Sequence, residues 1–413
     1  MISKESLRRY IYYSTILGVF SSVLAVQVPF SIRLFDAIML LNLLLMPLLI
    51  NCAMVPAWIL CFIIYLGLSG CIGILSGTDN LPLFAKEFLG ISVSLLYFYY
   101  FFRLIHNDQE RAFLAYARMA YWFTIIGFPF WVGKCIASHG YERYYGLARE
   151  PAAFCELVLP AYYWCTYLSF NSRRHLREVA VLTLAIVLSG SSLGYISVAF
   201  GLVLLLSGRK KHMLAVPIVV FVLLSLTYTI SPFFRLRVDD TLLAATSGDV
   251  GSSNLSTYAL ISNMLVTQQV LRESPLIGNG LGSHALSHAR LIDTVPGSEQ
   301  FVERGISTLN APDAASLTLR VLSELGILGF LGLLAFVFRY HVGGRGGRAA
   351  ISNAILVSFF LKLIRGGLYF PPEQFFFIFV YILNHRRSKS EVRGAARRAP
   401  LKLPLARLNL EAG

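Results

Sequence analysis

The chain has 413 residues, of which 56% are hydrophobic and only 14% are charged. Because a soluble domain usually carries about 25% charged residues, this composition excludes an ordinary soluble protein and predicts a polytopic membrane protein. In a soluble protein, the formal net charge of +14 would suggest nucleic-acid binding. Here the positive side chains follow membrane topology, so no nucleic-acid partner is expected.

Apolar segments long enough to cross a bilayer recur along the chain. The first follows a short basic N-terminus and has no small-residue cleavage site, so it is interpreted as a membrane helix and not as a signal peptide. The seventh and eighth segments are short and also fit one re-entrant pair. The pattern predicts an all-α protein with about twelve transmembrane helices, at residues 10–28, 34–50, 56–77, 83–105, 112–138, 151–170, 178–190, 193–207, 213–231, 314–338, 349–365 and 369–384.

Lysine and arginine alternate between the two sides of the predicted membrane. With a cytoplasmic N-terminus, the cytoplasmic segments, both termini included, hold most of the positive side chains, and the C-terminus is cytoplasmic too. Nine membrane helices then occupy residues 1–231 and three occupy 314–385. The large outside loop between them, 232–313, is too long for a plain connector and contains a predicted helix over 255–272. Residues 386–413 are expected to form a basic, disordered cytoplasmic tail on anionic lipid.

The stretch "YERYYGLAREPAAF" (141–154) places charges where a span begins on the outside face. Pro151 suits the first position of a helix, and the positive helix end with its free N–H groups would attract an anion. Arg143 and Arg149 flank this end, either as anion ligands or as interfacial anchors. Glu150 could cap the helix or accept a proton. Because the other even-numbered spans also start on this face, we expect several helix ends to converge on one outside-facing anion site.

Charged residues within the predicted spans call for partners. Arg320 is costly in a membrane and is therefore a functional candidate, although Glu324 one turn later would also pair with it structurally. Glu156 lies inside the sixth span, where a polar partner is expected. Lys86 and Glu87 would compensate one another.

The outside loop and its borders offer further candidates, each with two interpretations. Arg235 and Arg237 fit interfacial anchoring and ligand contact equally well. His284 and His288 are solvated loop residues or proton-transfer groups. The glycines of "GNGLG" (278–282) predict a turn, because the strand and helix of a dinucleotide site are missing. The six cysteines lie in or beside apolar segments, so we expect neither a disulfide framework nor a metal site, and no cofactor.

Three motifs, in order along the chain, resemble those of bacterial O-antigen polymerases and O-antigen ligases. "RYYGLAREPAAF" resembles the Arg-Gly-Glu-Pro start of a central helix in that family, and "LSGSSLGYISVAFGLVLLL" resembles its SxSRxG helix start. "ESPLIGNGLG" and "LRVLSELGILGFLGLL" resemble the pair of motifs that brackets the last large outside loop. Together the motifs cover about residues 143 to 332, more than half of the membrane region.

The resemblance implies a C-type-like glycosyltransferase architecture in the bacterial inner membrane. Family members act at the periplasmic face on undecaprenyl-diphosphate-linked glycans, without nucleotide sugars. Polymerases extend the glycan by repeat units, and ligases transfer the finished glycan to lipid A-core. The resemblance also allows for a co-polymerase that regulates chain length as a partner.

Two positions depart from the family pattern. Leu193 stands where arginine is common, and Ala315 and Ser316 stand where ligases have a His-Asn pair. The second departure favours a polymerase, with a ligase as the alternative and a lipid-linked glycan flippase as the alternative from another class. The expected substrate-binding residues are Arg143, Arg149, Arg290, Arg304 and Arg320, and the candidates for the catalytic base are Glu150, His284 and His288.

Overall fold

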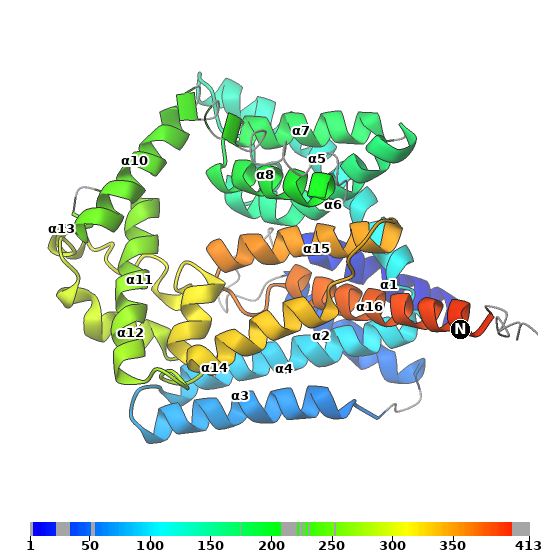
Figure 1. Ribbon diagram of the computed structural model, residues 1–413, viewed down its shortest axis with the longest axis horizontal. Helices are drawn as coiled ribbons and strands as arrows, with labels where there is room; N and C mark the ends of the chain where they lie inside the picture. Colours follow the sequence, from blue (N-terminus) through cyan, green and yellow to red (C-terminus); the bar gives the residue numbers. More distant parts are fainter. Residues whose placement is uncertain are drawn as a thin grey trace, which may run out of the picture.

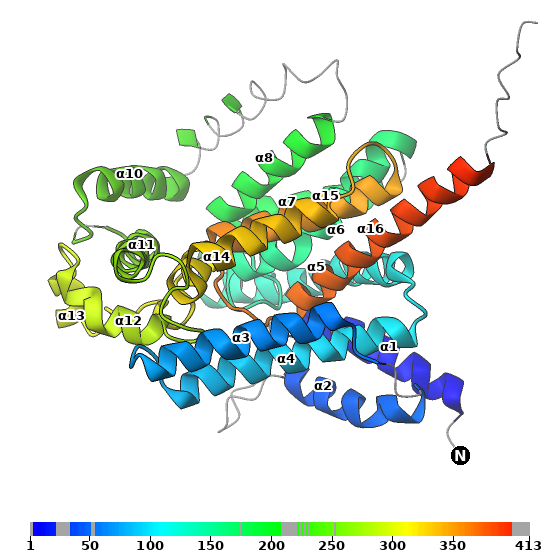
Figure 2. The same cartoon turned by 60° about the horizontal axis from the view of Figure 1, so that its bottom comes forward.

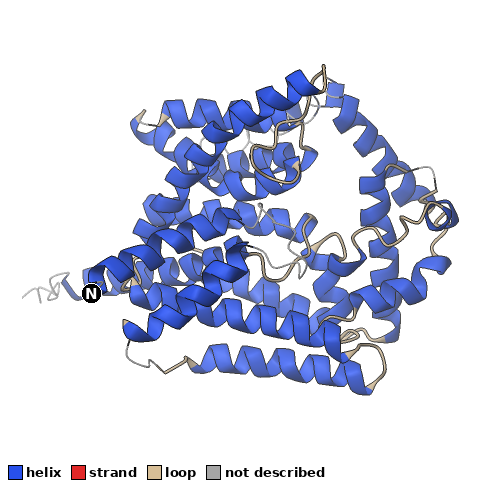
Figure 3. Ribbon diagram, turned by 180° about the vertical axis from the view of Figure 1, so that it is seen from behind, coloured by secondary structure: helices blue, strands red, loops and turns tan. Residues whose placement is uncertain are grey.

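A computed structural model describes residues 3–21, 34–50, 54–173, 175–207, 221–222, 225, 228–229, 232–251 and 253–398. Within these ranges the regular elements are all helices, as Figure 3 shows. The predicted all-α fold class is therefore confirmed. The predicted ninth span, 213–231, lies almost entirely outside the described residues.

The helices follow the predicted apolar segments closely, because a chain surrounded by lipid must satisfy its backbone hydrogen bonds within each segment. The seventh and eighth segments form two separate helices joined at Gly190, which has a φ of 55°. The first part of the bundle consists of α1 (Lys4–Ser21), α2 (Leu34–Leu45), α3 (Ala57–Leu75), α4 (Leu81–Leu104), α5 (Gln109–Ala137), α6 (Pro151–Ser172), α7 (Leu176–Ser189) and α8 (Ser192–Ser207).

The outside loop and the last membrane helices complete the fold. The loop contains α10 (Pro232–Ser247), α11 (Leu255–Glu273), α12 (His284–Leu291) and α13 (Glu299–Glu303), and the bundle ends with α14 (Leu317–Tyr340), α15 (Gly347–Ile364) and α16 (Pro372–Arg398). The side chain of Asn254 accepts hydrogen bonds from the first amides of α11, which confirms the predicted helix start. The final helix continues to Arg398, so the first part of the segment expected to be a disordered tail is helical.

The loop helices lie at the opposite end of the molecule from the start of α1 and the end of α16. In Figures 1 and 2, α10–α13 gather at one end, and the first residues of α1 and the far end of α16 lie at the other. The loop region has a small core of its own, in which the rings of Tyr258 and Phe301 stack 3.8 Å apart.

In the part of the chain that the structure describes, five helices are long and apolar enough to cross a membrane: α3, α4, α5, α14 and α15. Large apolar side chains such as Leu44, Leu75 and Phe338 are exposed on the surface of the bundle, where only lipid would make their exposure favourable. The protein is therefore a helical membrane protein.

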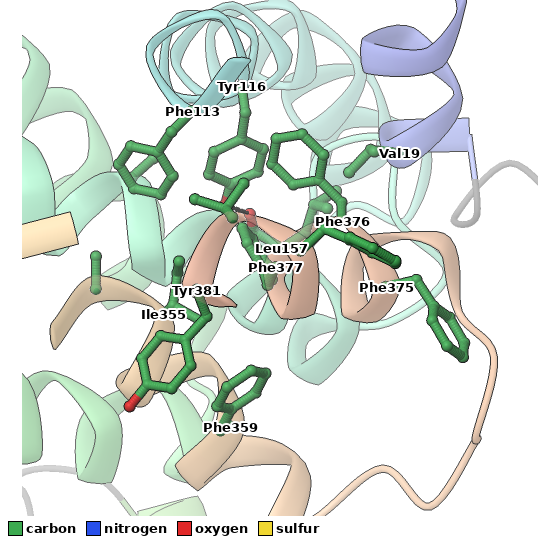
Figure 4. Packing of buried hydrophobic residues seen from close by; sticks show 14 of the residues in the cluster. Val19, Phe113, Tyr116, Leu157, Ile355, Phe359, Phe375, Phe376, Phe377 and Tyr381 are labelled. Atoms are coloured by element: carbon green, nitrogen blue, oxygen red, sulfur yellow. Dashed lines mark hydrogen bonds between the residues drawn. The ribbon is translucent and has the colours of Figure 1, made fainter. Parts of the chain in front are cut away.

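An aromatic core holds the centre of the bundle together. Tyr116 on α5 contacts Phe376 and Phe377 on α16, with ring centroids 5.8 and 5.0 Å apart, and its hydroxyl donates to the carbonyl of Leu157 on α6 (Figure 4). In the same bundle, α15 packs along α6 and also contacts α8, α14 and α16. The core therefore fixes the ends of α6 and α15, where the candidate site lies.

The glycine turn at 278–282 packs against a break in α14. Gly326 has a φ of 65°, which interrupts the helix. The carbonyls of Ser323 and Glu324 instead accept hydrogen bonds from the amides of Asn279 (2.9 Å) and Gly280 (3.0 Å). A Cβ atom on Gly326 would lie 2.3 Å from the carbonyl oxygen of Leu276. The predicted turn is thus confirmed. The two motifs that bracket the end of the loop, "ESPLIGNGLG" and "LRVLSELGILGFLGLL", meet in this close backbone contact.

Candidate anion site and membrane cavity

Three half-buried arginines from distant segments gather at the loop end of the bundle. Arg143 donates from Nε to Ser189 O and from Nη2 to Gly190 O, both at 2.9 Å, and so satisfies carbonyls at the end of α7. Arg237 on α10 lies 3.4 Å from Ser192 Oγ at the start of α8. Arg365, just after α15, donates to Ser256 O at 3.2 Å. We call these three residues the arginine cluster.

The positive charges of the arginine cluster act on one another. Burial lowers the pKa of Arg237, and Arg143 and Arg365 lower it further, while Glu150 opposes this shift. The bonds of the cluster go to neutral carbonyl and hydroxyl oxygens, and within the described residues none of the three forms an ion pair. An anion with several oxygens would therefore relieve repulsion and meet guanidinium donors suited to phosphate geometry.

Two helix N-termini lie beside the arginine cluster. Helix α6 starts with Pro151 after Glu150, whose side chain makes no capping bond. At the start of α8, Ser191 Oγ accepts from the amide of Gly194 at 3.3 Å, and Gly194 lets α8 approach Cys155 closely. The positive ends of both helices add to the field of the arginines.

A buried ion-pair group, which we call the Lys362 triad, lies one turn before Arg365. Lys362 Nζ on α15 contacts Glu156 Oε2 on α6 at 2.6 Å and Glu373 Oε1 on α16 at 3.0 Å. This contact confirms the polar partner expected for Glu156. A Cβ atom on Gly366 would lie 2.7 Å from Glu156 Oε1, so a glycine separates this carboxylate from the arginine cluster.

An apolar cavity of about 550 Å³ lies on the other side of Lys362. Its walls come from α3, α4, α14, α15 and α16 and include Leu66, Leu95, Leu333 and Phe375, while Lys362 is its only charged lining residue in the described part of the chain. The volume suits a small-molecule pocket, and the lining suits a hydrocarbon chain.

The structure separates the arginines predicted to bind substrate. Arg143 belongs to the cluster, and Arg149 is exposed beside Glu150 at the start of α6. Arg290 forms an exposed ion pair with Glu273, and Arg304 is exposed at the end of α13. The described contacts join neither Arg290 nor Arg304 to the arginine cluster.

Arg320 lies in a buried ion-pair group, which fits the structural interpretation of its charge, and its predicted role in substrate binding stays a prediction. Its guanidinium lies 3.0 Å from Glu324 and 3.1 Å from Glu87, donates to Gly367 O at 3.1 Å, and covers the ring of Tyr369. Only 2% of its side chain is exposed. The ion pair with Glu324 is the structural contact expected from the spacing of the two residues. The expectation that Glu87 pairs with Lys86 is wrong, because Glu87 pairs with Arg320.

The two loop histidines are buried, so the expectation of solvated residues is wrong. His284 contacts Ser323 Oγ (2.7 Å) and Asn263 Oδ1 (2.8 Å). Burial lowers the pKa of His284 to about 3 and that of His288 to about 4. Both are enclosed by protein, and pKa values this low make both weak bases, which argues against either as the catalytic base.

The sequence alone did not single out most of this site. Arg237 had two equal interpretations, and Arg365 and Lys362 were not selected. A usable signal existed: Glu156 and Lys362 are opposite charges inside two predicted spans, and such charges seek each other in a membrane. Among the described residues, no group of three histidine, cysteine, aspartate or glutamate side chains could hold a metal ion.

The chain was also compared with known proteins. No protein-family model, curated protein or solved structure matches it.

Proposed function

We propose that the protein is a polymerase that joins undecaprenyl-diphosphate-linked oligosaccharide repeat units into O-antigen or a related surface polysaccharide. The reaction takes place at the loop end of the bundle, which is the periplasmic face of the inner membrane in this proposal. The motif resemblance suggests the reaction class, and the site supplies the chemistry.

The arginine cluster is the observation that carries the proposal. Three guanidinium groups that form no ion pair within the described residues, placed beside two helix N-termini, suit a diphosphate. When the glycan leaves its lipid carrier, negative charge grows on the diphosphate, and fixed positive groups stabilise that charge in the transition state. Arg143, Arg237 and Arg365 hold the diphosphate, and Arg149 extends the positive surface toward solvent.

The apolar cavity accounts for the other half of such a substrate. A polyprenyl chain in the cavity between α3, α4 and α14 would exchange contacts with lipid tails for contacts with apolar side chains, so the cavity holds the chain by packing and not by removing it from water. A substrate with a charged head and a hydrocarbon chain thus matches the two features that flank Lys362.

The alternatives differ in the product that accumulates when the protein is lost. In a strain that lacks the protein, a polymerase defect leaves single repeat units attached to the surface acceptor. A ligase defect leaves polymer on the lipid carrier, and a flippase defect leaves repeat units on the cytoplasmic side. We expect the first pattern. At the positions of the His-Asn pair of ligases, Ala315 O accepts from the amide of Gly366, and Ser316 Oγ donates to Leu363 O and caps α14.

Complementation with variants tests the site in the same strain. Arg237→Ala should leave single-repeat glycan, whereas Arg290→Ala should restore long chains because its ion pair with Glu273 is exposed. Wild-type glycan length with Arg237→Ala, or polymer that remains on the lipid carrier in the deletion strain, would contradict the proposal.

A further inference from the structure

We propose that Glu156 is the general base that accepts the proton of the attacking sugar hydroxyl. This inference rests on the proposed polymerase function and names a catalytic residue for the same site. Its three supports are the position of Glu156, the charges that face it, and the access to one of its oxygens.

Glu156 lies where the head of the substrate would be. It is in the second turn of α6, whose N-terminus lies beside the arginine cluster, and with a rise of 1.5 Å per residue it lies about 9 Å along the helix axis from Glu150. Arg365 directly precedes Gly366, the residue that touches Glu156 Oε1. A sugar bound through its diphosphate at the arginine cluster is thus within reach of this carboxylate.

The two oxygens of Glu156 have different surroundings. Oε2 is held by Lys362 at 2.6 Å, which fixes the orientation of the carboxylate. Oε1 packs directly against Gly366, where even a Cβ atom would lie 2.7 Å from it, and 12% of the Glu156 side chain remains exposed. One oxygen is anchored by Lys362, and within the described part of the chain the other has no hydrogen-bond donor that would compete with an incoming proton.

The charges that face Glu156 leave one carboxylate in excess. Lys362 from α15 is shared with Glu373 from α16, and Glu150 at the start of α6 adds a further negative charge. Glu373 Oε2 is buried and has no hydrogen-bond partner among the described residues. One cation between two carboxylates can accommodate an added proton without creating an unpaired positive charge, which favours proton uptake. Lys362 and Glu373 act as positioning residues.

The transfer step balances with these groups alone. The hydroxyl oxygen of the acceptor forms a bond to the anomeric carbon of the donor glycan, and its proton passes to Glu156 Oε1. The bond between that carbon and the phosphate oxygen breaks, and its electron pair leaves with the lipid diphosphate, which the arginine cluster retains. The proton then returns to water through the exposed edge of Glu156.

Purified full-length protein in vesicles, supplied with its lipid-linked repeat unit, provides the test. A general base typically contributes about 100- to 10,000-fold to the rate, so Glu156→Gln should slow polymerisation at least about 100-fold while retaining farnesyl diphosphate binding. Wild-type protein should lose rate toward acid pH, and the residual rate of Glu156→Gln should lack this acid limb. Glu156→Asp should recover part of the rate.

A matched variant separates catalysis from stability. Glu373→Gln also alters the Lys362 triad, so if the triad is only structural, both glutamine variants should lose thermal stability and rate together. Normal polymerisation by Glu156→Gln, or an unchanged acid limb in that variant, would overturn the assignment of the base. Absence of polymerisation by the wild-type protein would instead overturn the proposed function.

Discussion

The arginine cluster predicts opposite effects of one substitution on ligand affinity and on stability without ligand. In Arg237→Ala the protein should bind an isoprenoid diphosphate more weakly, yet be at least as stable as wild type without ligand. Binding is weaker because a charged hydrogen-bond donor is lost. Stability is retained because the substitution relieves repulsion from Arg143 and Arg365. Burial and this repulsion both lower the pKa of Arg237. Arg237 is the best choice because its side-chain hydrogen bond within the described residues, to Ser192 Oγ at 3.4 Å, is long.

The size of the binding effect follows from the chemistry of the contact. A hydrogen bond to a charged group contributes about 1.5–3 kcal/mol, and 1.4 kcal/mol is a factor of ten in affinity. Loss of Arg237 should therefore raise the Kd about 10- to 150-fold. Farnesyl diphosphate is a suitable probe, because it carries the diphosphate on a short chain and can be titrated against protein in detergent.

A matched control removes an arginine that is exposed and already paired. Arg290→Ala breaks the surface ion pair with Glu273, which is worth about 0–1 kcal/mol to stability, and should leave the Kd within about threefold of wild type. The melting temperature without ligand is measured on the same samples. Equal weakening by both variants, or an unchanged Kd for Arg237→Ala, would refute the assignment of the diphosphate site.

Four further predictions test other parts of the structure. Gly332→Phe should fill the apolar cavity, since nothing lies within 4 Å of an added Cβ there. It should weaken binding of undecaprenyl diphosphate more than binding of farnesyl diphosphate. Gly133→Phe is the control, because Gly133 is also in open space but does not line the cavity, and it should change neither affinity. Arg320→Met leaves two buried carboxylates unpaired and should cost about 3–5 kcal/mol of stability, seen as a large fall in melting temperature, with no specific loss of diphosphate affinity in the folded fraction. Gly326→Ala should destabilise the protein by more than about 1 kcal/mol, measured by thermal denaturation, because its φ is positive and its new Cβ would clash with backbone; Gly332→Ala is the control. For His288, whose folded pKa of about 4 lies below the ordinary 6.5, stability is fully present above pH 6.5 and is lost as pH falls toward 4, with a loss of about 2 kcal/mol at pH 5. The protection factors of the α12 amides, which correct for the intrinsic pH dependence of exchange, should therefore fall about 30-fold between pH 7.5 and 5, and less in His288→Phe.

The membrane helices were predictable because their cause is local. Each lipid-exposed segment must be apolar and must satisfy its own backbone, so hydropathy alone located α3, α4 and α14. The start of α6 at Pro151 and the turn at 278–282 were also predictable, since proline and glycine restrict or permit particular backbone angles. None of these inferences needs knowledge of another segment.

The site was less predictable because its cause is tertiary. His284 sits in a short polar stretch that looks solvated, and only the packing of α11, α12 and α14 shows it to be buried. Glu87 finds Arg320 across the bundle, although Lys86 adjoins it in sequence. The arginine cluster likewise joins residues 143, 237 and 365, and no spacing along the chain could have connected them.

One cation held between two carboxylates occurs twice in this bundle, and the difference between the two groups carries the functional argument. Around Arg320 the group is sealed: Glu324 is fully buried, its second oxygen accepts from the amide of Gly282 at 3.0 Å, and the guanidinium is covered by an aromatic ring. Such a group joins helices and offers nothing to a substrate. Around Lys362, one carboxylate oxygen borders a glycine, close to three arginines that form no ion pair among the described residues, and the lysine itself faces an apolar cavity. An intramembrane charge that is only structural does not require this access, whereas a base that must receive a proton from a sugar held by its diphosphate does.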